Sequence, residues 1–256
     1  SAAVLADDGA GIVILPEAVT LNGPEARHRL IVERVVDGHF AGQIVNGVDF
    51  TSSDENVVCV KGGQLVPVGA GEATVSAKGG DLWDECKVKV AAMDEAWEWS
   101  FRNHVQPIFA KMGCNMGACH GAAAGKGGFR LSLRGFDPEG DFANITQQAL
   151  GRRIELADPA PSLILAKPSG AIPHKGGLRY ETDSYEYRVV ADWIAAGAKP
   201  PRDNDPRMER LEVLPKGMRL KVGDEQQLIV RAHYGDGRVK DVTAWAIFTS
   251  TNETVA

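Results

Sequence analysis

The sequence lacks several features that would assign it to a common class at once. It contains no long apolar run, so nothing indicates a membrane span. It has no excess of basic residues: the net charge is −6, and the acidic residues are dispersed, which argues against nucleic acid as the main partner. No complete signal peptide is present, and the chain begins at Ser1, which suggests a fragment of a longer protein. A hydrophobic content of 44% over 256 residues is enough for two or three domains with real cores.

The first part of the chain, residues 12–91, is predicted to be all-β. Short apolar segments alternate with glycine, asparagine or aspartate at the even spacing typical of a β-sandwich. In the last segment Cys86, Val88 and Val90 share one face, so Cys86 should point into the core. Cys59 and Cys86 then form either a disulfide or two buried thiols. The expected strands are 12–16, 28–36 with a turn at Asp37-Gly38, 45–50, 57–60, 64–68, 73–77 and 86–90.

Part of this segment returns near the end of the chain. Thr51 to Val58 is echoed by Thr249 to Ala256, an offset of 198 (249 − 51), and Arg29 to Val32 by Gln227 to Val230 at the same offset. Leu15-Pro16 is echoed by Leu214-Pro215, one residue further along. The sequence therefore predicts two copies of one β module, the second incomplete. Unpaired strands need cover, so we expect residues 211–256 to dock on the middle of the chain or to associate with another molecule.

The Leu-Pro start, the Asp-Gly turn and the Thr-Ser-Ser-Asp segment resemble bacterial immunoglobulin-like domains of group 2 over most of residues 12–91. This resemblance implies a sandwich used for spacing or adhesion rather than for chemistry.

The middle of the chain, residues 94–200, changes to helix and loop. An apolar stripe from Trp97 to Met112 predicts a helix, with Pro107 marking a kink or a restart. A short strand is expected over 127–133, a turn over 137–140, and helices over 142–150 and 158–167. A last helix should begin at an Asp183 cap and stop at Gly197. Residues 199–206 form a stiff polar linker.

Residues 113–121, Gly-Cys-Asn-Met-Gly-Ala-Cys-His-Gly, carry the most specific chemical signal. Cys-x-x-Cys-His attaches haem c covalently; here four residues separate the cysteines instead of two. Cys119 and His120 keep the adjacent thiol and imidazole that bond a haem vinyl group and the iron. A five-residue offset on a helix turns Cys114 about 140° from Cys119. The segment must therefore bulge out of any helix, which Gly113 and Gly117 allow.

Two other interpretations of these cysteines are a disulfide and a zinc site. A Cys114–Cys119 disulfide would close a tight loop but leaves His120 and the glycines unexplained. A zinc site needs further ligands, and no second cysteine pair lies nearby. We therefore predict one covalently bound haem c.

The middle segment resembles the c-type cytochromes, in particular the planctomycete-type cytochrome domain. The matching pieces are Val105 to Phe109, Cys119-His120-Gly121, Pro161 to Ile164 and Ala191 to Ala198. The resemblance implies a small helical fold around one haem that carries electrons. It departs from that family in the cysteine spacing, in a glycine-rich insertion at 125–135, and in having Ile172-Pro173-His174 where the family tends to have Met-Pro.

The sixth iron ligand decides what such a haem does. Candidates are His174, His104, Met112 and Met116, and His174 is preferred because its loop stands where the family puts its ligand. The haem propionates favour arginine or lysine partners, and the nearby candidates are Arg130, Arg134, Arg152, Arg153, Lys175 and Arg179.

The prediction is thus a multidomain chain: an immunoglobulin-like sandwich at 1–92, a mainly α cytochrome c-like domain at 93–200, and a linker with an incomplete second sandwich at 201–256. Its function would be electron transfer by one haem c, held by Cys114, Cys119, His120 and His174, in a larger extracytoplasmic (periplasmic or secreted) protein with an unknown redox partner. The segment itself is expected not to be an enzyme. A haem enzyme or gas sensor with an open sixth site, and an adhesion scaffold without haem, are the alternatives.

Overall fold

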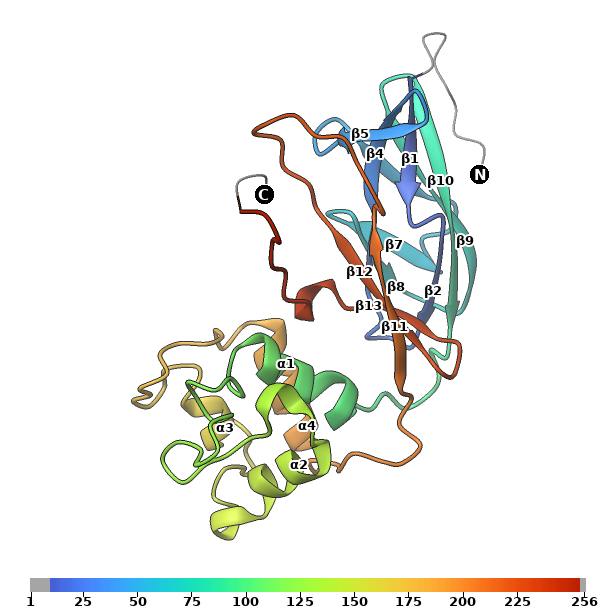
Figure 1. Cartoon of the computed structure of the whole chain (residues 1–256). Helices are drawn as coiled ribbons and strands as arrows, with labels where there is room; N and C mark the ends of the chain where they lie inside the picture. The colour runs from blue at the N-terminus through green and yellow to red at the C-terminus, as the bar shows by residue number, and fades with distance from the viewer. Residues whose placement is uncertain (1–9, 254–256) are drawn as a thin grey trace. The chain divides into compact units, whose positions relative to one another are not determined.

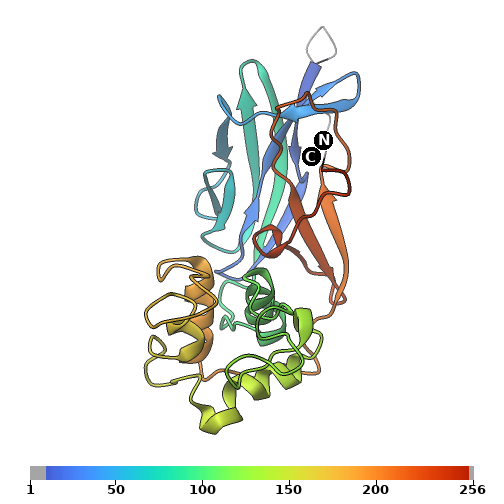
Figure 2. The same cartoon turned by 60° about the vertical axis from the view of Figure 1, so that its left-hand side comes forward.

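The computed structural model describes residues 10–253, in two compact units. The first unit contains residues 10–97 and 207–244, and the second contains 98–206 and the stretch from Trp245 onward. Figures 1 and 2 show the strands of the first unit and the short helices of the second. The second copy of the β module therefore shares a unit with the first copy, although the middle of the chain separates them in sequence.

The first module of the first unit consists of three small sheets, with strand orders β1-β4-β5, β2-β10-β9-β6 and β3-β8-β7. All strand pairs are antiparallel except β2 with β10, which is parallel. The strands are β1 (Ala10–Leu15), β2 (Ala18–Asn22), β3 (His28–Arg29), β4 (Ile31–Val36), β5 (His39–Gln43), β6 (Asp49–Ser52), β7 (Val58–Lys61), β8 (Gln64–Pro67), β9 (Gly71–Gly79) and β10 (Leu82–Ala91).

The hydrophobic core of this module collects side chains from all three sheets. Ile12 and Ile14 of β1 meet Val75 of β9 and Leu65 of β8 there, all of them 0–1% exposed. Cys86 is buried with Val88 and Val90, as the alternating pattern predicted. Most of the expected strands are present, but the sequence missed β2 and β5.

The expected disulfide between Cys59 and Cys86 is not formed, and both thiols are free. Val58 and Val60 point toward the core from β7, so Cys59 between them points the other way. Cys86 faces the core, where burial raises the pKa of its thiol to about 12.

The Asp37-Gly38 turn joins β4 to β5. Both residues have positive φ, 50° and 74°, which suits a two-residue hairpin turn. The hairpin continues to Gln43, so the strand expected over 45–50 is replaced by β5 and the shorter β6.

The second module repeats only the first sheet, with β11 (Met208–Leu214), β12 (Ile229–Tyr234) and β13 (Val239–Asp241) in the order β11-β12-β13. Leu211 and Val213, the counterparts of the buried Ile12 and Ile14, are 53% and 41% exposed. β6 pairs with β9 in the first module, and the second copy contains no counterpart of β9, so residues 247–251 form no strand. The echo of residues 56–58 at 254–256 lies outside the described residues.

The second module is covered in a way that the sequence did not predict. Its strands pack against the first module through Leu15, Ile31, Leu214 and Ile229. Only the stretch from Trp245 belongs to the second unit, where Lys111 Nζ donates to the Ala246 carbonyl.

The description of the middle as mainly α is wrong. The chain as a whole is 30% strand and 19% helix, a β-rich fold. The α-helices of the second unit are short: α1 (Gln106–Lys111), α2 (Pro138–Thr146), α3 (Leu163–Ala166) and α4 (Tyr185–Ala195). Turns and loops occupy most of the remainder. A glycine or proline two residues after the helix limits α1, α3 and α4: Gly113, Pro168 and Gly197.

Several local expectations for the second unit change in the structure. Pro107 marks a restart as expected: a π-helical turn (Phe101–Val105) precedes α1. Ser184, not Asp183, caps α4, and its hydroxyl accepts from the Tyr187 N–H. The expected strand over 127–133 is absent; only one isolated bridge joins Lys126 to Phe129. Asp137, expected in a turn, is the N-cap residue of α2, and its side chain accepts from the Gly140 N–H.

Asp141 joins three segments of the second unit. Its buried carboxylate accepts from the Ser132 N–H and hydroxyl and from Gln106 Nε2, so it links α2 to α1 and to the segment after the Cys-His motif. Asp141→Ala leaves these buried donors without an acceptor, and we expect it to lower the free energy of unfolding by about 3 kcal/mol. Asp183→Ala, at an exposed position, is the control. Denaturant titration followed by tryptophan fluorescence measures both, and equal midpoints would contradict the expectation.

Candidate functional site

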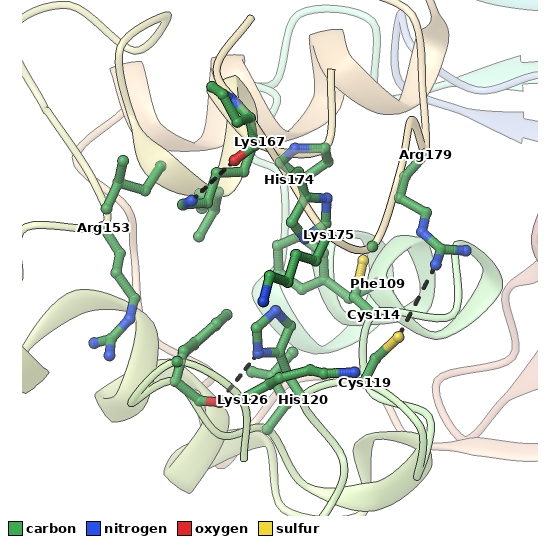
Figure 3. A pocket seen from close by; sticks show the side chains of 18 of the residues that line it. Phe109, Cys114, Cys119, His120, Lys126, Arg153, Lys167, His174, Lys175 and Arg179 are labelled. Atoms are coloured by element: carbon green, nitrogen blue, oxygen red, sulfur yellow. Dashed lines mark hydrogen bonds between the residues drawn. The ribbon is translucent and has the colours of Figure 1, made fainter. Parts of the chain in front are cut away.

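The candidate site is a pocket of about 790 Å³ within the second unit. Its apolar walls come from α1, α3 and the loop after the Cys-His motif, and its lining contains Cys114, Cys119, His120 and His174, the four site residues predicted from the sequence. Figure 3 shows their side chains directed into one space. The apolar lining residues are Phe109, Phe129, Leu131, Leu163, Ile164, Pro168 and Pro173.

The Cys-His segment leaves the helix as its spacing predicted. α1 ends at Lys111, Gly113 takes a positive φ of 75°, and successive turns lead to His120. The His120 N–H donates to the Cys114 carbonyl at 3.0 Å, so the first cysteine and the histidine are tied across the bulge. Gly117 does not adopt a positive φ; only Gly113 uses the conformational freedom of glycine here.

Gly121 is required by close packing rather than by its dihedral angles. A Cβ atom at this position would lie 2.0 Å from the Asn115 carbonyl oxygen and 2.6 Å from its carbon. Real side chains do not approach backbone that closely, so the turn after His120 closes onto Asn115 only because residue 121 has no side chain.

The two thiols of the pocket are both free. Burial raises the pKa of Cys114 to about 11, and the nearby Arg179 guanidinium opposes this rise. Arg179 Nη2 also lies 3.9 Å from Cys119 Sγ as a weak donor. Figure 3 shows the two sulfurs on the same side of the pocket as Arg179, so the guanidinium is placed beside both.

His120 presents Nε2 as its free ring nitrogen. Its Nδ1 lies 3.0 Å from the Phe129 carbonyl oxygen, and because a carbonyl only accepts, Nδ1 carries the proton. Burial lowers the pKa of His120, partly offset by this hydrogen bond, and the charges of His174, Lys126 and Arg153 lower it further. The neutral imidazole, the form that ligates metals, is thereby favoured.

His174 is oriented in the same way from the opposite loop. Its Nδ1 lies 3.0 Å from the Gly177 carbonyl oxygen, which again leaves Nε2 with the lone pair. A Cβ at Gly176 would lie 2.6 Å from His174 Cε1 and 2.9 Å from Nε2. The glycine therefore makes the room that this ring occupies.

The distance between the two imidazole rings matches the span of one metal ion. Their ring centroids are 6.4 Å apart and their planes differ by 5°. Imidazole nitrogens lie about 2.0–2.1 Å from a bound metal, and each centroid about 1.1 Å further, so two rings on opposite sides of one ion stand about 6.3 Å apart. Second-shell hydrogen bonds from the other ring nitrogen to a carbonyl are the usual support of such ligands.

The other candidate ligands do not line the pocket. His104 is buried between Trp99 and Trp245, and its Nδ1 accepts from the Ser100 N–H. Met112 and Met116 are absent from the lining, and Met116 is 48% exposed.

A set of basic side chains completes the lining, and no acidic residue is among the described residues that form it. Of the arginines and lysines proposed from the sequence, Arg130 and Arg134 do not line the pocket. Lys126 and Lys167 also line the pocket and were missed by the sequence analysis. The basic lining residues are Lys126, Arg152, Arg153, Lys167, Lys175 and Arg179.

Arg153 differs from the other basic residues because it is fixed by the protein. Its guanidinium donates to the carbonyls of Asn144, Gln148 and Gly128 and lies 4.6 Å above the Phe129 ring. It thus supports the same residue whose carbonyl orients His120, and its main role is structural.

No family model matches the chain, and no curated protein resembles it closely enough to count as a match. Between residues 10 and 253 no group of three or more His, Cys, Asp or Glu side chains is arranged to hold a metal ion. None of the helices in that range is both long enough and apolar enough to cross a bilayer.

Proposed function

We propose that this chain binds one haem c and serves as a one-electron carrier. Cys114 and Cys119 would hold the group by thioether bonds, and His120 and His174 would be its two axial ligands. One observation carries the proposal: two parallel imidazoles face each other 6.4 Å apart across a pocket, each with Nδ1 bonded to a carbonyl and Nε2 left for a metal.

The rest of the pocket supports the same ligand. A volume of about 790 Å³ lies in the range of cofactor sites, roughly 300–1,000 Å³. Phe109, Leu131 and Ile164 supply apolar wall for a flat ring system. A rim that contains basic but no acidic residues among those described suits the two carboxylates of a haem.

The chain's own residues would orient the group and limit the access of water. The carbonyls of Phe129 and Gly177 fix the two imidazole rings, and Gly176 leaves His174 room to approach. When bound, the haem iron supplies a single redox electron. Two imidazoles favour ferric over ferrous iron more than a histidine–methionine pair does, so we expect a low reduction potential.

We further infer that the chain works outside the cytoplasm, as part of a larger protein. Thioether attachment of haem belongs to extracytoplasmic proteins, and the flanking β modules suit a spacer role there.

A visible spectrum with an extraction test decides between the proposals. The protein, produced in cells that attach haem c, should show a split low-spin α/β pair when reduced. Acid-acetone should not extract the haem. A high-spin spectrum would instead favour an enzyme or gas sensor with an open sixth site. Absence of a Soret band would contradict haem binding and favour a scaffold.

Single cysteine variants test the attachment. Cys114→Ala and Cys119→Ala should each keep a covalent haem through the remaining thioether, whereas the double variant should lose it on acid-acetone treatment. Intact-mass spectrometry measures the added haem. Cys59→Ala is the control, since Cys59 lies in the first unit. If Cys114→Ala leaves the optical spectrum of the reduced haem unchanged, only Cys119 is attached.

A further inference from the structure

The two β modules contact each other through equivalent residues, as two subunits do across a two-fold axis. Both modules place their strands in the same antiparallel order, β1-β4-β5 and β11-β12-β13. Leu15 pairs with Ile31 in one, and their counterparts Leu214 and Ile229 pair in the other. Residues 28–33 and Gln43 therefore have counterparts 198 residues later, although the β4-β5 hairpin contains a bulge that β12-β13 lacks.

The centre of the contact is built from equivalent residues of the two modules. Leu15 and Ile31 of the first module form one buried cluster with Leu214 and Ile229 of the second. All four are at most 8% exposed. A surface that meets its own equivalent is the mark of an isologous interface, in which residue i contacts j and j contacts i.

The hydrogen bonds around this centre are reciprocal. The Arg29 N–H donates to Asp241 Oδ2 at 2.8 Å, and the Gln227 N–H donates to Gln43 Oε1 at 2.9 Å. Residue 227 is the counterpart of 29, and 241 is the counterpart of 43. The same backbone donor of each module thus binds the same side-chain position of the other.

Residues 28 and 33 and their counterparts also lie at this contact, but here two buried polar atoms lack a hydrogen-bond partner. Glu33 accepts from Gln226, the counterpart of His28. On the other side, burial lowers the pKa of His28, Asp241 opposes this, and the charge of Arg231, the counterpart of Glu33, lowers it further. Both Glu33 and His28 are at most 2% exposed, and Glu33 Oε2 and His28 Nε2 have no hydrogen-bond partner.

Two copies of the first module would resolve this mismatch. In a pair of first modules related by the same two-fold axis, each Glu33 would face the His28 of the other copy. Each Arg29 N–H would face Gln43, an acceptor already used in this way by Gln227. The apolar centre would be two Leu15 and two Ile31 side chains.

We infer that the β1-β4-β5 face, defined by Leu15, Ile31, Glu33 and Gln43, together with His28 of β3, is a self-complementary docking surface for a module of its own kind. In the intact chain the second module occupies it, at the high effective concentration that one chain provides. When the second module is displaced, the occupant is the same face of a second copy of this chain.

Full-length variants test this inference. Ile229→Arg places a charge in the buried centre and should expel the second module. The core of the first module is a separate cluster without residue 229 and should persist. Sedimentation should give the monomer mass, 27.4 kDa for the polypeptide, for the parent chain and twice the parent mass for Ile229→Arg. Ile31→Arg/Ile229→Arg should return to the monomer.

Two further measurements make the outcome decisive. Hydrogen exchange over 229–234 should accelerate in Ile229→Arg, which shows that the second module has left. Adding His28→Ala to Ile229→Arg should weaken dimerisation about tenfold, because Glu33 loses its hydrogen-bonding partner. A monomeric Ile229→Arg, whether its second module remains protected or not, overturns the inference. Larger assemblies overturn it too, because an isologous contact closes at two copies.

Discussion

Replacing His174 by alanine should change the protein from a low-spin to a high-spin ferric spectrum. Under the proposed function, His174 holds one axial position and His120 the other. The alanine variant removes one imidazole but leaves both cysteines and His120 in place. The haem should therefore stay attached, while water takes the sixth position and carbon monoxide binds readily to the reduced form.

The controls for this variant come from the residues that the pocket excludes. Met116→Leu changes an exposed methionine of the same motif, and His39→Ala an exposed histidine of the first unit; both should keep the low-spin spectrum. Added imidazole should restore that spectrum in His174→Ala, because it fills the vacated space. An unchanged low-spin spectrum in His174→Ala would show that another side chain holds the sixth position.

Gly121→Ala should be the most damaging single methyl addition in the second unit. The new Cβ would lie 2.0 Å from the Asn115 carbonyl oxygen, with backbone on both sides of the clash. Since backbone cannot rotate away as a side chain can, the turn after His120 has to open. We expect a loss of about 4 kcal/mol in the free energy of unfolding and, under the proposed function, loss of stable haem attachment.

Gly117→Ala is the matched control, four residues earlier in the same loop. A Cβ at Gly117 meets nothing within 4 Å, and its φ is not positive, so this variant should change stability by less than about 1 kcal/mol. Denaturant titration and the Soret absorbance report both properties. Equal stability of the two variants would show that the turn at Asn115 is less closely packed than the structure indicates.

Local features of the chain were predictable because they depend on neighbouring residues. The alternation in β10 placed Cys86 in the core, the Asp37-Gly38 pair marked a hairpin, and Pro107 marked a helix start. The spacing of Cys114 and Cys119 required a bulge, and the structure contains one. Each of these follows from backbone geometry over a few residues.

Predictions that depended on contacts between residues far apart in the sequence were less successful. The middle segment carries helical stripes, but the glycines and prolines between them leave only short helices, so a mainly α domain was the wrong expectation. Cys59 and Cys86 looked like a disulfide pair until the strands placed them on different faces. The packing of the second module on the first was not predicted, because a strand pattern does not state which apolar surface will cover it.

By itself the sequence determined which residues have the chemistry of the site: two thiols, an adjacent imidazole and a second histidine in a proline–glycine loop. Only the tertiary structure decided that the rings of His120 and His174 face each other 6.4 Å apart. It also decided that the Phe129 and Gly177 carbonyls orient them. The reason is physical: local sequence sets the conformation of each loop, but the distance between two loops depends on the packing of everything between them.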